Sequence, residues 1–452
     1  MEEASTKNPP AREGVADGAP GWFQFHSIEL PNGEIIPGFQ SLDRLKRRIA
    51  QFPLPENLKG KTVLDIGASD GWFSFEMERR GCRVTAVDRA KQPGFLLAKE
   101  RLGSRVDYRA MNVYDLSPGN VGQFDIVLFL GVLYHLKHPI LGLERVCALT
   151  KDMALIESHV SLDSGDSSAD AKPSMEFYET DELRGQHDNW CGPNPACLLS
   201  FCRTAGFGRV QLLSIIEDRA HVVCYRHWEP PPASPAYPEP KVDHAVEVLS
   251  ETRYLSSHND DHVSIFFNTP ERDLTHSNVF PEVGGYAIQP LYVGRNGDAG
   301  WQANCKVPPG LAPGWHDVRV RTANSAFSDP VQIAVDLERQ PPSVEHLQIE
   351  IVADGTTWSR NQVALSSESY VSVWLSGLPQ NAEREDVKVR IGETGLPVSF
   401  LSSPDRRGFR QANARLPWDF PAGDYPLVVV CAGAVSAPAD LKVIPDERWA
   451  AS

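Results

Sequence analysis

The sequence predicts an α/β fold for the first half of the chain, a Rossmann-like doubly wound domain, followed by all-β sandwich modules. Short apolar strands alternate with helical stretches up to about residue 228, which is typical of βαβ units that build a parallel sheet. A proline-rich segment then interrupts the chain. Beyond it, short strand-like runs lie between turn residues, without helical periodicity, as in β-sandwiches.

The length and the composition divide the chain into segments. A chain of 452 residues suffices for two to four domains. We expect a disordered leader at 1–20, which is polar, and the Rossmann-like domain at 21–228. Six of the thirteen residues in 229–241 are proline, which predicts a stiff linker. The two β-rich modules are expected at 242–338 and 343–446, on either side of a second proline pair.

The charge balance argues against a nucleic-acid partner. Residues 1–230 contain 26 Lys and Arg against 31 Asp and Glu, and the remainder contains 18 against 28, so the net charges are −5 and −10. Neither part resembles a phosphate-binding surface. One basic cluster interleaves with apolar residues at helical spacing, and we interpret it as a solvated helix face. It consists of Arg44, Lys46, Arg47 and Arg48.

No membrane or metal partner is expected. The chain has no run of about 20 apolar residues, as a membrane-spanning helix requires. Its first residues lack the apolar core of a secretory signal, so we expect a cytoplasmic protein. The 8 cysteines form no CxxC pair. We therefore expect no metal site and interpret the cysteines as small apolar residues.

The ends of the two β-rich modules form a weak internal repeat. Residues 311–335 and 420–444 both read as a proline and glycine turn, an aromatic residue, an alternating strand, a small-residue turn and a final strand. Both resemble the terminal hairpin of immunoglobulin-like modules of the IPT/TIG kind. Such a tail serves as a spacer or oligomerisation module, or docks on a glycan. Its tryptophans are expected to fill sandwich cores rather than to stack on sugars.

The segment from Val63 to Phe73, VLDIGASDGWF, carries the first candidate chemistry. An apolar strand leads through Asp65 into a turn with Gly67 and Ala68, and Gly71 opens a helix. This is the first βα turn of a dinucleotide-type fold, in which glycine lets the backbone approach a ligand. A carboxylate at the strand end suits the cationic amino group of S-adenosylmethionine (SAM). A purely structural turn is the alternative.

Further strand ends favour SAM over a nicotinamide cofactor. Asp88, followed by Arg89, ends the next apolar strand and lies where a ribose hydroxyl pair is bound. Ser69 stands in place of the second glycine of the nicotinamide fingerprint. Asn112 and Val113 follow a third strand and are placed to flank the adenine.

A central strand brings the candidate catalytic residues. Residues 124–135, FDIVLFLGVLYH, begin with a buried apolar strand. Its carboxyl end carries Tyr134 and His135, where doubly wound folds bind ligands. We expect Tyr134 to shape the path of the methyl group and His135 to act as a general base. The alternative for His135 is a hydrogen-bonded structural histidine, since methyl transfer depends mainly on alignment.

Longer segments resemble one methyltransferase family, the methyltransferase-9 or DUF1698 type, which is related to the tRNA wobble-uridine carboxymethyltransferase. The resemblance covers about residues 22–228 and implies a Rossmann-like SAM site. It implies that Tyr134 lies at the active site, that Leu130 contacts the cofactor and that Glu157 faces the acceptor. The matching segments include VLDIGASDGWFSFEMERRG, FDIVLFLGVLYHLKHPILGLERV, LIESH, FYETDEL and NWCGPNPACLLSFCRTAGF.

The same resemblance raises carboxy-SAM as an alternative cofactor. The carboxymethyltransferase holds the extra carboxylate with basic residues, one of which Arg219 matches. A lysine is expected near residues 22–28 and is absent. A carboxylate without its cation is costly in a closed pocket, so we favour SAM. Arg219 has a simpler interpretation, an ion pair with Glu217 or Asp218.

The polar stretch 161–194 is expected to be a lid or an acceptor-binding loop. Loop packing is the alternative interpretation of its aromatic residues. The candidate substrate-binding residues are Tyr178, Asn189, Trp190, Asn194 and Arg219, with Phe177 beside them.

The sequence therefore predicts a SAM-dependent methyltransferase. Its acceptor is unidentified, and a small molecule or glycan is favoured over nucleic acid. Catalysis is assigned to Tyr134, His135 and Glu157. One alternative is a carboxy-SAM-dependent tRNA carboxymethyltransferase. Another is a non-catalytic scaffold that binds through its immunoglobulin-like tail.

Overall fold

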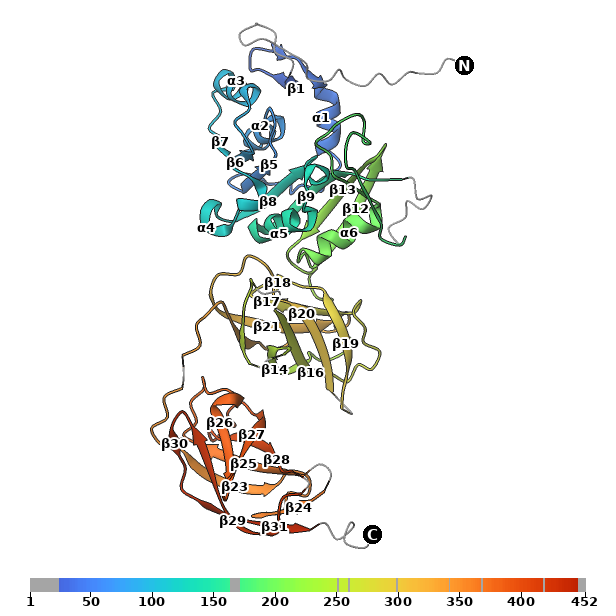
Figure 1. Cartoon of the computed structure of the whole chain (residues 1–452). Helices are drawn as coiled ribbons and strands as arrows, with labels where there is room; N and C mark the ends of the chain where they lie inside the picture. Colours follow the sequence, from blue (N-terminus) through green and yellow to red (C-terminus); the bar gives the residue numbers. More distant parts are fainter. Residues whose placement is uncertain are drawn as a thin grey trace. The chain divides into compact units, whose positions relative to one another are not determined.

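The computed structural model describes residues 24–162, 171–249, 252–258, 261–297, 300–340, 342–366, 369–417 and 419–445. The leader expected at 1–20 lies outside these residues. The chain divides into two compact units, one comprising Met1–Leu249 and Leu255–Asp336, the other Ser250–Tyr254 and Leu337–Ser452. Figure 1 labels their helices and strands.

A seven-stranded sheet organises the first part of the chain (Figure 1). Its strand order is β7-β6-β5-β8-β9-β13-β12, in which the first five strands are parallel and β13 and β12 are antiparallel. The order reverses between β5 and β8, which is where doubly wound folds bind ligands. The strands are β5 (Thr62–Ile66), β6 (Arg83–Asp88), β7 (Asp107–Ala110), β8 (Phe124–Leu130), β9 (Thr150–His159), β12 (Arg209–Ile216) and β13 (Arg219–Tyr225).

Helices cover both faces of this sheet. Alternate residues of β8 belong to two different apolar clusters, since Ile126 packs in one and Val127 in the other. The first cluster contains residues of α1, α2 and α3, and the second contains residues of α5 and α6. The predicted Rossmann-like doubly wound fold is therefore confirmed. The helices are α1 (Leu42–Ile49), α2 (Trp72–Arg79), α3 (Pro93–Leu102), α4 (Pro118–Val121), α5 (Pro139–Leu149) and α6 (Pro195–Thr204).

Short elements surround the carboxyl edge of the sheet. Before α1, β1 pairs with β4, and the carboxylate of Asp70 accepts the backbone N–H groups of Phe25 (2.6 Å) and His26 (3.1 Å). Asp70 thereby holds β1 against the turn between β5 and α2. The short elements are β1 (Gln24–His26), β2 (Ile28–Glu29), β3 (Ile35–Ile36), β4 (Gly38–Gln40), β10 (Met175–Phe177), β11 (Cys191–Pro193) and the 3₁₀ turns η1 (Val113–Asp115) and η2 (Leu133–His135).

The next module is a β-sandwich with its own apolar core. One sheet has the order β14-β16-β20-β19 and the other β15-β22-β21-β17-β18. Its strands are β14 (Lys241–Glu247), β15 (Tyr254–Leu255), β16 (His262–Asn268), β17 (Val279–Val283), β18 (Tyr286–Ala287), β19 (Pro290–Asn296), β20 (Gly300–Lys306), β21 (Gly314–Thr322) and β22 (Val331–Val335).

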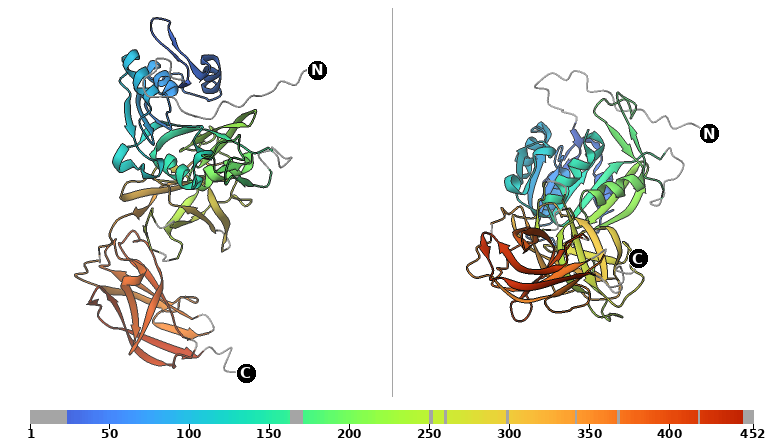
Figure 2. Two further views of the ribbon diagram at one scale, coloured as in Figure 1. Left: turned by 45° about the horizontal axis from the view of Figure 1, so that its top comes forward. Right: turned by 60° about the horizontal axis from the view of Figure 1, so that its bottom comes forward.

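The last module is also all-β, and its strands form one long, nearly closed sheet around a separate apolar core. No α-helix occurs in the described part of 342–445, coloured orange to red in Figure 2. Its strands are β23 (Gln348–Asp354), β24 (Gln362–Leu365), β25 (Tyr370–Ser376), β26 (Val387–Ile391), β27 (Thr394–Leu401), β28 (Arg410–Arg415), β29 (Gly423–Cys431), β30 (Ala434–Val435) and β31 (Ala439–Pro445). The likeness to IPT/TIG modules stays a prediction.

A buried arginine joins the Rossmann-like domain to the first β-module. Arg226 is completely buried, and its guanidinium donates to Pro309 O (2.7 Å) and to Sγ of Cys147 (2.8 Å). The guanidinium lies 3.8 Å from the centre of the Tyr286 ring. The backbone N–H of Ala287 donates to Arg226 O at 2.7 Å. The two parts therefore share a packed interface within one compact unit.

We expect the Arg226→Ala substitution to lower the free energy of unfolding by about 2–4 kcal/mol, because it leaves buried acceptors unpaired and opens a cavity. Urea unfolding followed by circular dichroism measures this. Arg203→Ala, which removes an exposed guanidinium from α6, is the control and should change stability little. Equal effects of the two substitutions would contradict the role assigned to Arg226.

Candidate cofactor and acceptor site

The turn between β5 and α2 is built on two glycines. Gly67 has φ +76° and Gly71 has φ +88°, a conformation that glycine adopts without strain. A Cβ at Gly67 would collide with Cγ2 of Val132, so any larger side chain would also be excluded for lack of space. The N–H groups of Gly67 and Ala68 donate to Val87 O at 2.8 and 3.2 Å. The turn is thereby fixed against the end of β6.

Asp65 is a buried carboxylate just before this turn. It is 2% exposed, and its Oδ2 accepts a hydrogen bond from Oγ of Ser74 at 2.6 Å. Burial raises the pKa of Asp65 to about 6, opposed by the bond from Ser74 and reinforced by the negative charge of Asp88. A ligand with a positive charge nearby would relieve this unfavourable burial, which fits the amino group of SAM.

Asp88 lies at the carboxyl end of the neighbouring strand, β6. Its Oδ2 accepts the N–H of Ser69 at 3.0 Å, and its Oδ1 accepts a bond from Nε2 of Gln92 at 3.3 Å. The side chain is half-buried, whereas Arg89 is exposed. Asp65 and Asp88 thus flank the same turn, as a bound amino-acid end and a ribose would require.

The two residues predicted to flank the adenine lie at the end of the third strand. Asn112 is exposed, and its Oδ1 accepts the N–H of Tyr114 at 3.1 Å, which caps the turn η1. Val113 is buried. Leu130, the last residue of β8, is also buried. Their contacts with a cofactor stay predictions.

Buried polar groups without partners lie beside the β5–α2 turn. Both amide atoms of Gln24, which is 4% exposed, have no hydrogen-bond partner among the described residues, and neither has Nδ1 of His26. Burial, reinforced by Arg48, lowers the pKa of His26 to about 3, so this imidazole is neutral. Such groups are normally satisfied. Their presence here fits a polar ligand such as the amino-acid end of SAM.

Glu157 is the centre of a buried ion cluster on the same face of the sheet. It is 2% exposed and pairs with Arg48 of α1 through a short hydrogen bond. Nη1 of Arg219 lies 3.4 Å from the other carboxylate oxygen. Burial opposes ionisation, but the charges of Arg48 and Arg219 outweigh it and lower the pKa of Glu157. Glu157 therefore holds two guanidinium groups, which makes it a poor base.

Arg48 corrects the sequence interpretation of the basic cluster. Its side chain is 17% exposed, so this residue is not part of a solvated helix face. It follows Leu45 by three positions and therefore shares the buried side of α1. It also brings a cation to the pocket side of the sheet, where the sequence analysis found no lysine. By contrast, Arg44 and Lys46 are exposed, as the interpretation predicted.

Tyr134 and His135 follow β8 in the turn η2. Tyr134 is buried, its ring lies 4.6 Å from the guanidinium carbon of Arg219, and burial raises its pKa. Nδ1 of His135 lies 2.9 Å from the carbonyl oxygen of Asp188. Because a carbonyl only accepts, Nδ1 carries the proton and Nε2 keeps its lone pair. Burial lowers the pKa of His135, so the base form prevails at neutral pH.

The comparisons with known proteins cover this region of the chain. A family model described as a methyltransferase domain matches residues 39–207. These residues form a methyltransferase domain. Both this match and the fold bear out the predicted class, a Rossmann-like methyltransferase domain. The finer likeness to the DUF1698 type and to a tRNA-modifying enzyme stays a prediction.

Curated relatives of the methyltransferase domain are ubiquinone biosynthesis O-methyltransferases. That of Dechloromonas aromatica is 40% identical over 112 residues, which is 24% of this chain and 47% of the relative. That of Xanthomonas campestris pv. campestris strain B100 is 38% identical over 132 residues, 28% of this chain and 50% of the relative. The chain thus spans about half the length of these relatives.

Two similar solved structures each cover about two fifths of the chain. The 1,6-didemethyltoxoflavin-N1-methyltransferase of Burkholderia thailandensis has 22% identity and a TM-score of 0.30, over 37% of this chain and 71% of that one. The N-terminal domain of EvdMO1 has 21% identity and a TM-score of 0.31, over 40% of this chain and 79% of that one.

Most of the candidate substrate-binding residues hold the loop of the methyltransferase domain together. The hydroxyl of Tyr178 is 3.1 Å from Nε2 of His159 and donates to Glu176 at 3.0 Å. Asn194 caps α6, since its Oδ1 accepts the N–H of Cys197 at 2.8 Å. Asn189 is 1% exposed and donates to Leu183 O at 3.1 Å. These contacts support loop packing.

Trp190 and Arg219 are more accessible. The backbone N–H of Trp190 donates to Tyr134 O at 2.7 Å, which places this loop directly over η2. Its half-buried ring lies 4.1 Å from the ammonium group of Lys137. Arg219 pairs with Glu157 rather than with Glu217, since its buried Nη1 lies 3.4 Å from the carboxylate, as an ion pair without hydrogen-bond geometry. An acceptor contact of either residue stays a prediction.

Sequence reasoning missed three residues of the methyltransferase domain that the fold brings to this edge. Gln24 and Arg48 reach it from the N-terminal elements, and His159 reaches it from the end of β9, where Nδ1 is 2.8 Å from Asp218. The alternation of Leu155, Glu157 and His159 could have shown that the last two share a face. Only the folded chain shows that β1 and α1 lie beside that face.

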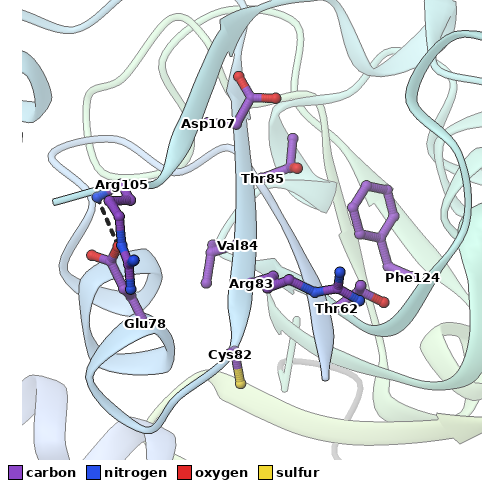
Figure 3. Close-up of a pocket in the computed structure, with 9 residues that line it drawn as sticks. All are labelled: Thr62, Glu78, Cys82, Arg83, Val84, Thr85, Arg105, Asp107 and Phe124. Atoms are coloured by element: carbon purple, nitrogen blue, oxygen red, sulfur yellow. Dashed lines mark hydrogen bonds between the residues drawn. The ribbon is translucent and has the colours of Figure 1, made fainter. Parts of the chain in front are cut away.

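A hollow of about 480 Å³ lies elsewhere on the domain (Figure 3). Its lining includes the first residues of four strands, Thr62 of β5, Arg83 of β6, Asp107 of β7 and Phe124 of β8. These are the amino ends of parallel strands, opposite the candidate site.

No group of three or more His, Cys, Asp or Glu side chains suited to a metal ion occurs in the described ranges. None of the described helices is long and apolar enough to span a lipid bilayer.

Proposed function

We propose that this protein is an O-methyltransferase that uses SAM to methylate a hydroxyl group of a small-molecule or glycan acceptor. The observation that carries this proposal is the arrangement at the carboxyl edge of the sheet. Asp65 and Asp88 flank the glycine turn on one side, and Tyr134 and His135 follow the adjacent strand β8. The candidate SAM-binding carboxylates and the candidate general base therefore lie on neighbouring strands, at the point where the strand order reverses.

The residues fit SAM by their chemistry. Asp65 offers a carboxylate to the amino group, Asp88 offers one to the ribose hydroxyls, and Gln24 has a free amide. SAM, when bound, supplies a methyl group already activated by the sulfonium. The protein then needs chiefly to orient the acceptor and to exclude water. The buried Tyr134 narrows the space beside Gly131, since a Cβ there would lie 3.7 Å from the tyrosine hydroxyl.

His135 is assigned the proton transfer. Its Nδ1–H donates to the carbonyl of Asp188, which leaves Nε2 available to take the proton of the acceptor hydroxyl. The acceptor oxygen forms its bond to the methyl carbon as the bond from that carbon to sulfur breaks, and S-adenosylhomocysteine leaves. The relatives are O-methyltransferases, which supports an oxygen acceptor.

The test is a transfer assay with the full chain and methyl-labelled SAM. Candidate acceptors are polyhydroxylated phenols, neutral sugars, nucleosides and bulk tRNA. We expect label on a phenol or a sugar, and much less at the same SAM concentration with the Asp65→Asn variant. Label on tRNA alone would replace the proposed acceptor by a nucleic acid. Transfer only with carboxy-SAM would replace the proposal by carboxymethylation. No binding of SAM in titration calorimetry would favour the scaffold reading.

We expect the His135→Gln substitution to lower kcat by about 100- to 10,000-fold, the usual contribution of a general base, with SAM affinity unchanged. Because the pKa of His135 is lowered, wild-type kcat should be flat near neutral pH and fall as the pH drops below the ordinary value of 6.5. His187→Gln, in the exposed loop, is the control. A kcat unchanged in His135→Gln would make this residue structural.

A further inference from the structure

The two β-modules share sequence motifs that their cores do not require. Residues 262–267 read HVSIFF and residues 370–375 read YVSVWL, while Gln-Ala-Asn occurs at 302–304 and again at 411–413. In each module the first motif lies on one strand and the second on its antiparallel neighbour, at the same register. The motifs therefore form the same three-dimensional arrangement twice.

In the first module this arrangement lies on the outer face of β16 and β20. Ser264 pairs with Asn304 and Phe266 with Gln302 in the register of the two strands. Oδ1 of Asn304 accepts bonds from Oγ of Ser264 (2.9 Å) and Nε2 of Gln302 (2.8 Å). Tyr292, opposite Asn304 on β19, is 49% exposed. Aromatic rings thus flank a hydrogen-bonded amide pair.

The second module repeats this on β25 and β28. Ser372 pairs with Asn413 and Trp374 with Gln411. Oδ1 of Asn413 accepts bonds from Oγ of Ser372 (2.8 Å) and Nε2 of Gln411 (2.9 Å). Phe400, opposite Asn413 on β27, is 41% exposed and follows a register shift, as Tyr292 does on β19.

These side chains face away from the cores. Ala303 and Ala412, in the middle of the two Gln-Ala-Asn motifs, are fully buried in the cores, so the flanking Gln and Asn point outward. Burial explains why Val263 and Val371 are repeated. It does not explain why the two modules keep the same amides and neighbouring aromatic rings on the side away from the core, each with a buried serine bonded to the Asn.

The second module extends its face with a strained tryptophan. Trp358 has φ +61°, which is unusual for a bulky residue, and is 57% exposed. Its ring centre is 5.8 Å from that of Trp374. The turn that presents it is anchored by Asp354, whose carboxylate accepts the N–H groups of Thr356 (2.8 Å) and Thr357 (2.7 Å). A strained backbone that keeps an exposed tryptophan ring in place indicates a ligand-binding role for this ring.

The chemistry of both faces suits a neutral sugar polymer. Aromatic rings present flat apolar surfaces to the C–H faces of sugars, and the Gln and Asn amides offer donors and acceptors to hydroxyl groups. A nucleic acid would need several basic residues. Each face has one at its edge, Lys306 or Arg415, its central side chains are neutral, and residues 231–452 carry a net charge of −10 (18 − 28). We propose that the outer faces of β14-β16-β20-β19 and of β23-β25-β28-β27 are two equivalent binding sites for neutral oligosaccharide chains.

The test is affinity electrophoresis of the full chain in gels that contain a neutral polysaccharide, with β-glucan, α-glucan, xylan and galactomannan as probes. We expect retardation by at least one of them. The Trp374→Ala and Phe266→Ala substitutions should each weaken it, and the double variant should weaken it about tenfold or more. The control is Trp315→Ala, an exposed tryptophan on β21 in the other sheet of the first module, which should change nothing.

Gel retardation and melting followed by circular dichroism together separate an effect on binding from an effect on folding. Phe400→Ala and Trp358→Ala remove exposed rings, so they should weaken retardation and leave the melting temperature unchanged. Retardation by none of the four polysaccharides would overturn the proposal. Retardation that survives all the face substitutions, or that occurs only with a polyanion, would also overturn it. Methyl transfer to small acceptors is measured separately, so failure here leaves the proposed activity intact.

Discussion

The Asp65→Asn substitution is expected to weaken SAM binding at pH 7.5 by about 30- to 1,000-fold, which corresponds to about 2–4 kcal/mol for a buried charged pair that loses one partner. Asp65 is 2% exposed and lies two positions before Gly67 of the glycine turn. Its amide replacement keeps the shape and the bond to Ser74 Oγ but loses the charge. Titration calorimetry with SAM measures the dissociation constant.

The pH dependence gives this prediction a second test. Because the pKa of Asp65 is raised to about 6, this carboxyl is largely protonated at pH 5 and ionised at pH 7.5. SAM binding should therefore tighten as the pH rises through about 6 and then level off. The Asp65→Asn variant should lose this dependence. A wild-type affinity that is the same at pH 5 and pH 7.5 would contradict the ionic role of Asp65.

The stability of the ligand-free protein is the control. A carboxyl with a raised pKa favours the folded state when protonated, and this contribution is lost as the pH rises from about 4 to about 6. At pH 7.5 the Asp65→Asn variant should therefore melt no lower than the wild type. Lost SAM binding with unchanged melting shows that the site, rather than the fold, has changed.

The second large effect is expected for Glu157→Gln, which should lower the free energy of unfolding by about 3–5 kcal/mol. The substitution leaves the guanidinium groups of Arg48 and Arg219 close together without a countercharge, in a region where Glu157 is 2% exposed. Urea unfolding measures the change. Glu34→Gln, which breaks the exposed pair with Arg101, is the control and should have little effect.

The same residue contributes to acid sensitivity. The pKa of Glu157 is lowered because the two arginines outweigh its burial, so its contribution to stability is complete above the ordinary value of 4.5 and is lost as the pH falls below it. The Glu157→Gln variant should lose less stability than the wild type between pH 5 and pH 3. Equal stability of the two proteins at pH 7 would show that Glu157 is not the charge centre of the cluster.

Local patterns were sufficient to predict the strand ends and the turn that carry the candidate cofactor residues. Asp65, Gly67 and Asp88 occur at strand ends that periodicity alone can find, and parallel strands bring their carboxyl ends to one edge. The acceptor side depends on elements that are distant in sequence. Arg48 reaches Glu157 across 109 positions of the chain. Nothing in the local sequence of α1 indicates that Arg48 pairs with Glu157.

The sequence by itself determined the alternation of strands and helices, the glycine turn with its two carboxylates and the all-β tail, because these follow from side-chain periodicity and backbone freedom over short distances. Only the tertiary structure decided that two arginines balance the charge of Glu157 and that Tyr178 and Asn194 hold a loop. It alone also showed that each of the two modules carries the same side-chain arrangement on its own outer face. Those properties depend on which residues meet across the fold. Burial and charge are set by such neighbours rather than by sequence position.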